Sequence, residues 1–212
     1  MFDIKDTLSK GELIHILAHF GPNHGWVTAP PLKYYEWSMT PPEWTACTRK
    51  RLGMDVFPAE IQCTTCQWNK LDSKGNHATI CKGGASRILR HNEVRDIIGK
   101  AFKDIGYDIG YEHGGGLMDG RKPGDVIVYN WKNRKHLLID VAVSSPLAVT
   151  NHPHLLAHWP GNTAKHWEGK KRRKYWDLDK TTYEFWPFII ETTGAFGPSA
   201  LKLRKLVAEK RT

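Results

Sequence analysis

The clearest pattern along the chain is a run of apolar residues at three- and four-residue spacings after Ser86. This spacing is typical of an amphipathic helix and predicts roughly five turns that end near residue 105. The positions predicted to form its apolar face are Ile88, Leu89, Val94, Ile97, Ile98, Ala101, Phe102 and Ile105.

Other segments carry weaker helix signals. Ser9 and Glu12 form a capping box, and a Thr-Pro-Pro-Glu start at residues 40–43 predicts a short helix that ends near residue 53. Residues 164–178 and 198–210 also have helical patterns, and the second of these segments is basic. Helices are therefore expected at both ends of the chain.

Strand signals lie between the central and C-terminal helical segments. Residues 125–129 and 136–143 are apolar runs joined by a polar linker, so we expect them to pair as a hairpin. Residues 185–193 predict one more strand. The order of elements predicts an α/β (α+β) fold, with a small mixed central sheet flanked by helices.

The pattern divides the chain into three predicted segments. Residues 1–60 read as a helical N-terminal elaboration, 61–84 as a Cys/His knuckle with few large apolar groups, and 85–212 as a core that ends in a basic helix. The knuckle is expected to depend on a metal for its order, because it lacks an apolar core of its own.

Three cysteines and a histidine follow the pattern Cys-x2-Cys-x10-His-x3-Cys, formed by Cys63, Cys66, His77 and Cys81. Two close ligand pairs of these types are typical of a structural Zn²⁺ site, and four protein ligands leave no open position for catalysis. The alternative is a set of buried free thiols with an unrelated histidine. Cys47, further upstream, is predicted to be a core thiol.

Charge and hydropathy restrict the environment. The chain has 212 residues and a formal charge of +9, which favours polyanionic partners such as nucleic acid. The apolar runs are too short to cross a bilayer, and the acidic start lacks the apolar region of a signal peptide. We therefore expect an intracellular protein, nuclear in a eukaryote, that is neither secreted nor associated with membranes.

Two carboxylates stand out in the predicted hairpin. Asp125 and Asp140 lie at the ends of apolar runs, where an unpartnered charge is costly. Pairing of the strands would bring both carboxylates to one end of the sheet, where they could hold Mg²⁺. The alternative is structural: Asp125 belongs to a Pro-Gly-Asp turn and Asp140 pairs with an arginine.

The segment 164–178 places one lysine among apolar residues. Helical spacing puts Ala164, Trp167, Lys171, Tyr175 and Leu178 on one stripe. An ammonium on such a stripe needs an anion, and the two aspartates are candidates. The remaining cations face outward and would follow a nucleic-acid backbone, or form only a solvated face; they are Lys170, Arg172, Arg173 and Lys174.

These motifs together resemble one known family. The Cys-Cys-His-Cys knuckle is followed by Arg-His-Asn at 90–92, Lys-Pro-Gly-Asp at 122–125, Asp-Val-Ala-Val at 140–143 and Lys-x3-Tyr at 171–175. Their order over residues 40–197 resembles the restriction-like endonuclease domain of site-specific non-LTR retrotransposons, of the PD-(D/E)xK superfamily, as a stand-alone or detached copy.

The resemblance implies a Mg²⁺- or Mn²⁺-dependent endonuclease that hydrolyses DNA phosphodiesters. Asp125 and Asp140 would hold the metal, Lys171 would assist the attacking water, and Tyr175 would support the lysine. A third acidic ligand would be Glu93 or Glu112. Implied partners are DNA, either branched or at a target site, and a reverse transcriptase or element ribonucleoprotein.

The sequence departs from that family's pattern at two positions. Gly124 separates the proline from Asp125, and Ala142 stands where a strand lysine is expected, so that Lys171 would replace it from the next helix. The trio Arg90, His91 and Asn92 would contact DNA or anchor the knuckle on the long helix. The alternative function is a non-catalytic DNA- or RNA-binding module with a decayed nuclease site.

Overall fold

The computed structural model describes residues 9–19, 38–111, 124–151 and 161–211. The chain forms two compact units, each built from several segments. The first comprises Met1–Arg87, Ser145–Asn162 and Thr192–Ala195, and the second Ile88–Ser144, Thr163–Glu191 and Phe196–Thr212. The three-segment division made from sequence stays a prediction.

The first unit contains short elements around the Cys/His knuckle. These are α1 (Lys10–His19), α3 (Pro41–Arg51), β1 (Ile61–Gln62), β2 (Lys70–Leu71), α4 (Asn76–Ile80) and the 3₁₀ turn η4 (Val149–Asn151). The predicted capping box at α1 is confirmed, because Glu12 accepts a 2.9 Å hydrogen bond from the Ser9 amide and the Glu12 amide donates to Ser9 Oγ. Thr40 and Glu43 form the same motif at α3.

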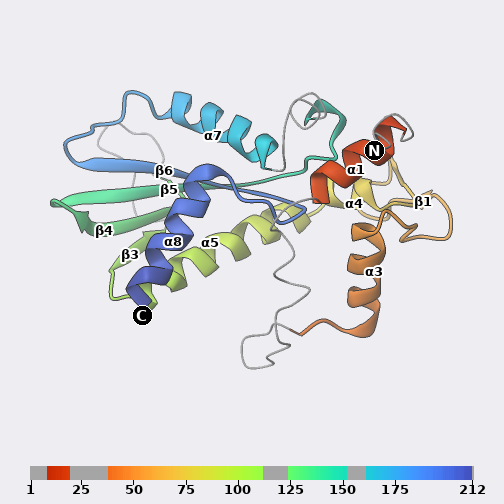
Figure 1. Ribbon diagram of the computed structural model, residues 1–212, viewed down its shortest axis with the longest axis horizontal. Helices are drawn as coiled ribbons and strands as arrows, with labels where there is room; N and C mark the ends of the chain where they lie inside the picture. The colour runs from red at the N-terminus through yellow and green to blue at the C-terminus, as the bar shows by residue number, and fades with distance from the viewer. Residues whose placement is uncertain (1–8, 20–37, 112–123, 152–160, 212) are drawn as a thin grey trace, which may run out of the picture. The chain divides into compact units, whose positions relative to one another are not determined.

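The second unit is a four-stranded mixed sheet with helices on both faces (Figure 1). The sheet order is β3-β4-β5-β6, antiparallel except for the parallel pair β5 and β6. Its elements are α5 (Ser86–Asp104), β3 (Ile109–Tyr111), β4 (Val126–Lys132), β5 (Lys135–Ser144), α7 (Asn162–Lys174), β6 (Tyr183–Glu191) and α8 (Pro198–Arg211). The prediction of a small mixed sheet flanked by helices is confirmed.

The hairpin turn is tighter than the sequence predicted. Asn133 and Arg134 both have positive φ angles, 51° and 63°, which is the backbone of a two-residue turn whose twist suits paired strands. β4 therefore continues through residues 130–132, where Trp131 is buried. The polar residues at 130–134 predict a longer linker, which the structure does not contain.

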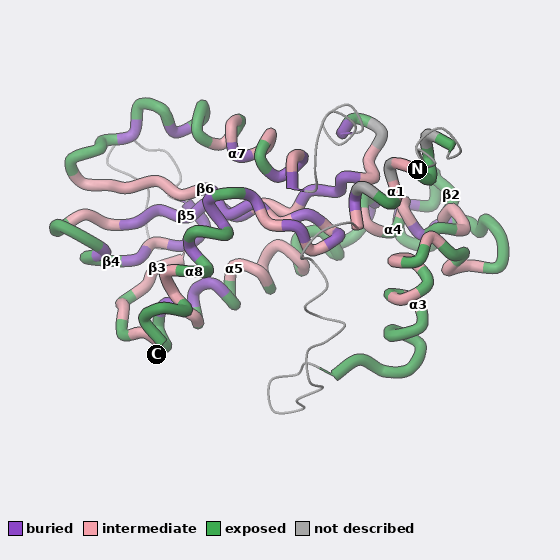
Figure 2. Tube along the Cα trace, viewed as in Figure 1, coloured by how far each residue is buried: buried purple, intermediate pink, exposed green. Residues whose placement is uncertain are grey.

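Alternation along β5 divides its side chains between the two faces of the sheet. Leu137, Ile139 and Val141 pack with residues of α5 and α8 in the main core. Leu138 points to the other face and packs with Leu178, just after α7. Asp140 shares the parity of Leu138, so the strand directs its carboxylate toward α7. Figure 2 shows β5 as a mostly buried strand.

One part of the α5 prediction is wrong. Ile98 and Phe102 are buried as expected, but Ile88, Leu89 and Ile97 are more than half exposed. A helix turns about 100° per residue, so Ile97 cannot share the core-facing stripe that Ile98 and Phe102 occupy. The apolar residues of α5 thus cover a wider part of the helix surface than the face that packs.

Among the described residues, none of the helices has the length and the apolar character that a membrane span requires.

Candidate functional site

The hairpin register brings Asp125 and Asp140 together. Val126 pairs with Ile139 and Ile127 with Leu138, so the next step of the same antiparallel ladder sets Asp125 opposite Asp140. Both residues are buried, with 8% and 6% exposure. The two carboxylates therefore lie at the same end of the sheet, where the sequence predicts them.

Gly124 allows this approach. A Cβ atom at this position would lie 2.6 Å from the carbonyl oxygen of Ile139, closer than real Cβ atoms come to a neighbouring oxygen. Only glycine fits unless the backbone of one strand moves. The glycine that separates Pro123 from Asp125 is thus required by the close approach of this segment to the neighbouring strand β5, which the sequence alone did not indicate.

Asp125 is held by two donors. Its Oδ2 atom accepts a 2.5 Å hydrogen bond from the Val141 amide and lies 3.3 Å from His91 Nε2. Burial alone would raise the pKa of Asp125, but the His91 contact, the Val141 amide and the charge of Lys171 together lower it. The carboxylate is therefore ionised at neutral pH.

His91 takes a position that neither sequence alternative named. It reaches from α5 to Asp125, and its other ring nitrogen lies 3.4 Å from Asn92 Oδ1. The hydrogen bond to Asp125 raises the pKa of His91 against the opposing effect of burial. His91 is thus the hydrogen-bonding partner of Asp125, and its side chain is half-buried.

Asp140 is held by Lys171 and Tyr175 of the α7 segment. Lys171 Nζ lies 2.5 Å from Asp140 Oδ2, and the Tyr175 hydroxyl donates a 3.4 Å hydrogen bond to Oδ1. Tyr175 is buried and its ring stacks on Phe185. The structure therefore brings together four predicted residues, Asp125, Asp140, Lys171 and Tyr175, with α7 packed over the face that carries Asp140.

Two buried glutamates fix α7, and sequence reasoning missed both. Glu191 at the end of β6 accepts a 3.0 Å hydrogen bond from the Ala164 amide in the first turn of α7. Glu168, within α7, accepts hydrogen bonds from the amide and hydroxyl of Ser199 in the first turn of α8. Carboxylates suit helix N-termini because the first amides lack partners there. The sequence does contain a sign of these roles: one glutamate lies in an apolar strand, and the other lies on an otherwise basic helix.

The predicted outward cations of α7 are exposed, namely Lys170, Arg172, Arg173 and Lys174. Lys170 lies over the Trp167 ring at 4.1 Å, and Arg172 donates a 2.7 Å hydrogen bond to Ser199 Oγ. These contacts position two of the guanidinium and ammonium groups without removing them from solvent. The helix thus presents a basic surface beside the half-buried Lys171.

The remaining predicted residues do not join the acidic pair. Glu93 is exposed on α5 and belongs to no described group of three or more potential metal ligands. Glu112 lies outside the described residues. Asn92 accepts a 3.3 Å hydrogen bond from Arg95, and Arg90 is half-buried on the same helix. Lys171 contacts Asp140, and its charge helps to lower the pKa of Asp125.

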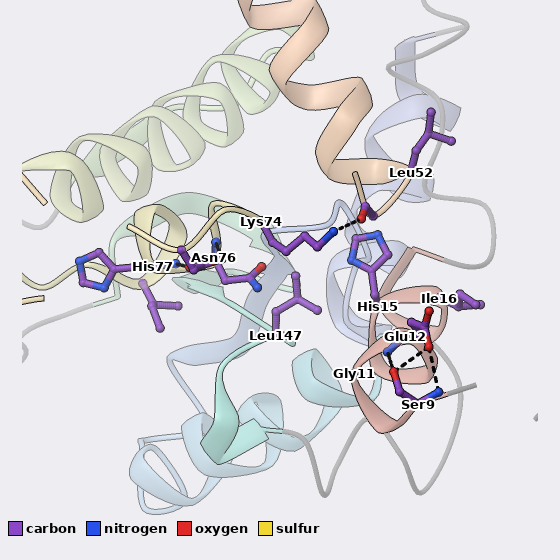
Figure 3. Close-up of a pocket in the computed structure, with 13 residues that line it drawn as sticks. Ser9, Gly11, Glu12, His15, Ile16, Leu52, Lys74, Asn76, His77 and Leu147 are labelled. Carbon is purple, nitrogen blue, oxygen red and sulfur yellow. Dashed lines mark hydrogen bonds between the residues drawn. The ribbon is translucent and has the colours of Figure 1, made fainter. Parts of the chain in front are cut away.

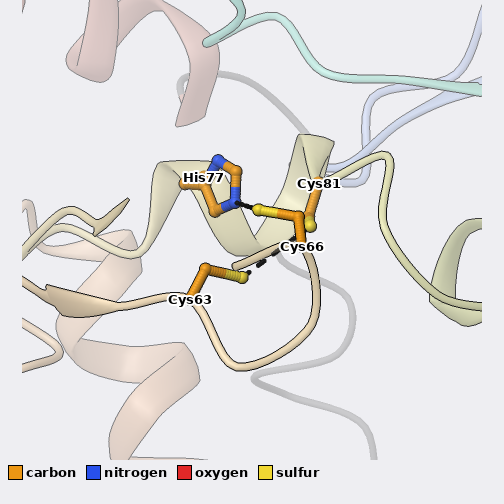
Figure 4. A group of neighbouring side chains, drawn as sticks. All are labelled: Cys63, Cys66, His77 and Cys81. Atoms are coloured by element: carbon orange, nitrogen blue, oxygen red, sulfur yellow. Dashed lines mark hydrogen bonds between the residues drawn. The ribbon is translucent and has the colours of Figure 1, made fainter. Parts of the chain in front are cut away.

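The knuckle forms a second site, in the first unit (Figure 4). The potential ligand atoms of Cys63, Cys66, His77 and Cys81 all lie within 4.8 Å of one another. The sulfurs of Cys63 and Cys81 are 3.8 Å apart, and Cys66 Sγ is 3.3 Å from His77 Nε2. Ligands at about 2.3 Å from a tetrahedral zinc would place two sulfurs about 3.8 Å apart. The cluster is near enough to bind one metal ion.

Local structure holds these four ligands in place. Asp72 accepts hydrogen bonds from the amides of Asn76 and His77 and so starts α4. A Cβ atom on Gly83 would lie 2.6 Å from Cys66 Cα, so the chain passes too close there for any side chain. A hydrogen bond from the Cys66 amide lowers the pKa of Cys63 to about 6, which favours the thiolate that binds metal. The prediction for Cys47 is wrong, because this thiol is exposed.

A cavity of about 780 Å³ lies beside the knuckle in the first unit (Figure 3). It is lined by aliphatic side chains such as Ile16 and Ile80 and by a larger number of polar or charged ones. Lys74 crosses it and donates a 2.6 Å hydrogen bond to the Gly53 carbonyl oxygen. His77 also lines it, so one wall of the cavity is part of the metal-ligand cluster.

Comparison with known proteins adds no further assignment. A scan against protein families finds no match, and no curated protein matches the sequence.

Proposed function

We propose that the chain is a metal-dependent DNA endonuclease that hydrolyses phosphodiester bonds. The observation that carries this proposal is the meeting of Lys171 with the carboxylate of Asp140, which lies opposite Asp125 at the end of the hairpin. Two acidic groups at one end of the sheet, with a lysine that reaches them from α7, are the chemistry that phosphodiester hydrolysis needs.

The donor set fits a hard divalent cation. Asp125 and Asp140 offer carboxylate oxygens, which Mg²⁺ and Mn²⁺ prefer, and the low pKa of Asp125 keeps its oxygens unprotonated. Both residues would hold the ion, which would polarise a phosphate oxygen and a bound water when present. Glu93 is exposed on α5, and the remaining ligands would be water or substrate oxygens.

The chain's own residues divide the other tasks. Lys171 would donate hydrogen bonds to the attacking water or to a phosphate oxygen and so neutralise charge that develops in the transition state. Tyr175 orients the Asp140 carboxylate through its hydroxyl. The exposed cations of α7 would follow the DNA backbone, because each phosphate contact releases condensed counterions.

We further propose that the knuckle binds one structural Zn²⁺ and that the second unit is a restriction-endonuclease-like core. Three thiolates and an imidazole in a closed set of four match structural zinc rather than a catalytic site. The mixed sheet with α7 on one face and α5 and α8 on the other supports the fold proposal.

Cleavage of supercoiled plasmid DNA by zinc-loaded protein in Mg²⁺ tests the proposal. We expect nicking by the wild type and a loss of at least about 100-fold in Asp140→Asn. Asp108→Asn, which alters an exposed carboxylate of the same unit, is the matched control and should cleave normally. Asp140→Asn should still bind DNA. Equal cleavage by Asp140→Asn would overturn the assignment of this residue.

One observation favours the alternative of a binding module without turnover. Asp125 already has a hydrogen-bonding partner in His91, and Asp140 is paired with the ammonium of Lys171. Both carboxylates are thus engaged by side chains of the protein itself. If neither wild type nor variant cleaves any DNA while both bind it with a steep dependence on salt, the binding function stands and the nuclease is rejected.

A further inference from the structure

The second unit contains a cavity of about 530 Å³ that is lined in part by Tyr175, whose hydroxyl bonds to Asp140. Its wall includes the turn after α7 and the beginnings of β5 and β6. Tyr175 belongs to both places, because its hydroxyl reaches Asp140 while its ring stacks on Phe185 at a centroid distance of 4.3 Å. A ligand in this cavity would therefore lie next to the acidic pair.

An exposed tryptophan forms part of the cavity. Trp176 is 73% exposed, although a side chain of this size normally gains by burial. Its neighbour Tyr175 is 4% exposed, so the turn buries one ring and presents the next. An indole held at a cavity beside a polar site is suited to stack on a flat partner.

Three cations line the same cavity as this tryptophan. Lys135, Arg172 and Lys180 all line the cavity, against one carboxylate, that of Glu184. Glu184 accepts a 2.6 Å hydrogen bond from Trp186 Nε1, so its charge is engaged within the protein. The cavity is thus net positive and would attract an anionic ligand.

The wall that carries Trp176 is well fixed. Asp179 accepts hydrogen bonds from the amide and the hydroxyl of Thr181, at 2.8 and 2.6 Å. Lys135 Nζ donates a 2.7 Å hydrogen bond to the Lys180 carbonyl oxygen and ties the same turn to β5. A fixed site loses less conformational freedom when it binds a ligand.

From these features we infer that the cavity binds an unpaired nucleotide, with the base stacked on Trp176 and its phosphates on Arg172 and Lys180. The volume lies within the range of about 300–1,000 Å³ that small ligands occupy. A stacking ring bordered by cations is the usual way to hold single-stranded nucleic acid, because every base has a flat face. A base inside a duplex cannot present that face.

The inference rests on the proposed function for its choice of DNA, and it deepens that function. A nuclease with a nucleotide subsite next to Asp140 would prefer substrates with unpaired bases near the cut. Duplex DNA would still contact the exposed cations of α7, but it would leave the cavity unused.

Fluorescence anisotropy of labelled oligothymidylate with the zinc-loaded full chain, in buffer without Mg²⁺, tests the subsite. We expect Trp176→Ala to bind about tenfold more weakly and Trp176→Phe to keep most of the affinity. Trp68→Ala, at a residue with similar exposure of 69%, is the control and should bind like the wild type. Binding of a blunt duplex should be unchanged in all of them.

The same measurement with oligouridylate shows whether the nucleotide belongs to DNA or RNA. Binding of both polymers should depend on Trp176, and the polymer that binds more tightly is the ligand. Unchanged oligothymidylate and oligouridylate binding in Trp176→Ala would overturn the inference, as would an equal loss of duplex binding. The assay needs no cleavage, so an effect of Trp176→Ala in a protein that cleaves neither plasmid nor single-stranded DNA rejects the nuclease and keeps the subsite. Plasmid nicking by a protein whose oligonucleotide binding is unchanged in Trp176→Ala keeps the nuclease and rejects the subsite.

Discussion

The ammonium of Lys171 and the carboxylate of Asp140 meet at 2.5 Å across the interface between α7 and β5. Ala142, two residues after Asp140 on the same strand, is where the family resembled by the sequence would carry a lysine. Residues two apart on a strand point to the same face, so a lysine there would face the same helix. Lys171 supplies the cation to that face from the helix instead.

The strength of this ion pair can be measured by a double-mutant cycle. Lys171→Met leaves Asp140 largely buried without its cation and should cost about 1–3 kcal/mol, less than for a fully buried pair because the lysine side chain is 23% exposed. The double variant Asp140→Asn, Lys171→Met should be more stable than the sum of the single effects predicts. Urea unfolding gives these values.

Arg173→Met is the control for that cycle, because Arg173 lies on the same helix and is exposed. It should change the free energy of unfolding by less than about 0.5 kcal/mol. Additive single effects would show that Lys171 and Asp140 do not interact in solution.

Gly124→Ala should be more damaging than its size suggests. The new Cβ would lie 2.6 Å from the Ile139 carbonyl oxygen, so the hairpin must open or Asp125 must move. We expect a loss of about 1–3 kcal/mol in thermal or urea unfolding and weaker plasmid cleavage. Gly169→Ala, on α7 with open space around its Cβ position, should be neutral or stabilising. Wild-type stability in Gly124→Ala would contradict the close contact.

Metal analysis should find one zinc ion per chain. Cys63→Ser is expected to abolish stoichiometric zinc and to make the knuckle sensitive to protease, because four ligands hold a segment with little apolar core. Cys47→Ser alters an exposed thiol outside the cluster and should keep the full zinc content. Retention of zinc in Cys63→Ser would exclude this residue as a ligand.

Much of the second unit was predictable because its strands and helices follow simple periods. The hairpin, the parallel strand β6 and the basic helix α8 all follow from alternating or helical apolar spacing. The site was partly predictable for the same reason: helical spacing placed Lys171 inward with Tyr175. The pairing of His91 with Asp125 was not, because it depends on the tertiary packing of α5 against the hairpin end.

The exposed face of α5 and the role of Gly124 could not be read from residue types. Ile97 and Ile98 are of the same residue type, yet Ile97 is 67% exposed and Ile98 is 6% exposed. Only the position of the sheet decides which of them packs. Likewise, nothing local distinguishes Gly124, which lies against a neighbouring strand, from a glycine in an open turn.

Acid titration should reveal the fixed turn beside Trp176. Hydrogen bonds from Thr181 and Thr182 lower the pKa of Asp179 from 3.8 to about 2. The resulting stabilisation is present above the ordinary value and is lost as pH falls through about 2. NMR titration of the carboxyl carbon should give a midpoint near 2, and Thr181→Ala should raise it. A midpoint at the ordinary value would show that the turn is not formed.

Removal of the carboxylate that joins α7 to α8 should loosen both. Glu168→Ala leaves the amide and hydroxyl of Ser199 without their acceptor and should cost about 1–2 kcal/mol. Glu93→Ala, at an exposed position on α5, is the matched control. Urea unfolding measures both, and equal stabilities would show that the cap contributes nothing.

The two glutamate caps also bear on how the second unit comes apart. Glu191 connects β6 to the start of α7, and Glu168 connects α7 to the start of α8. In each case, a carboxylate of one element accepts a hydrogen bond from an amide in the first turn of the next helix. Elements linked in this way open together rather than one at a time. Hydrogen exchange should therefore find β6, α7 and α8 in a single cooperative unit, and Lys171 keeps its place at the sheet until that whole unit unfolds.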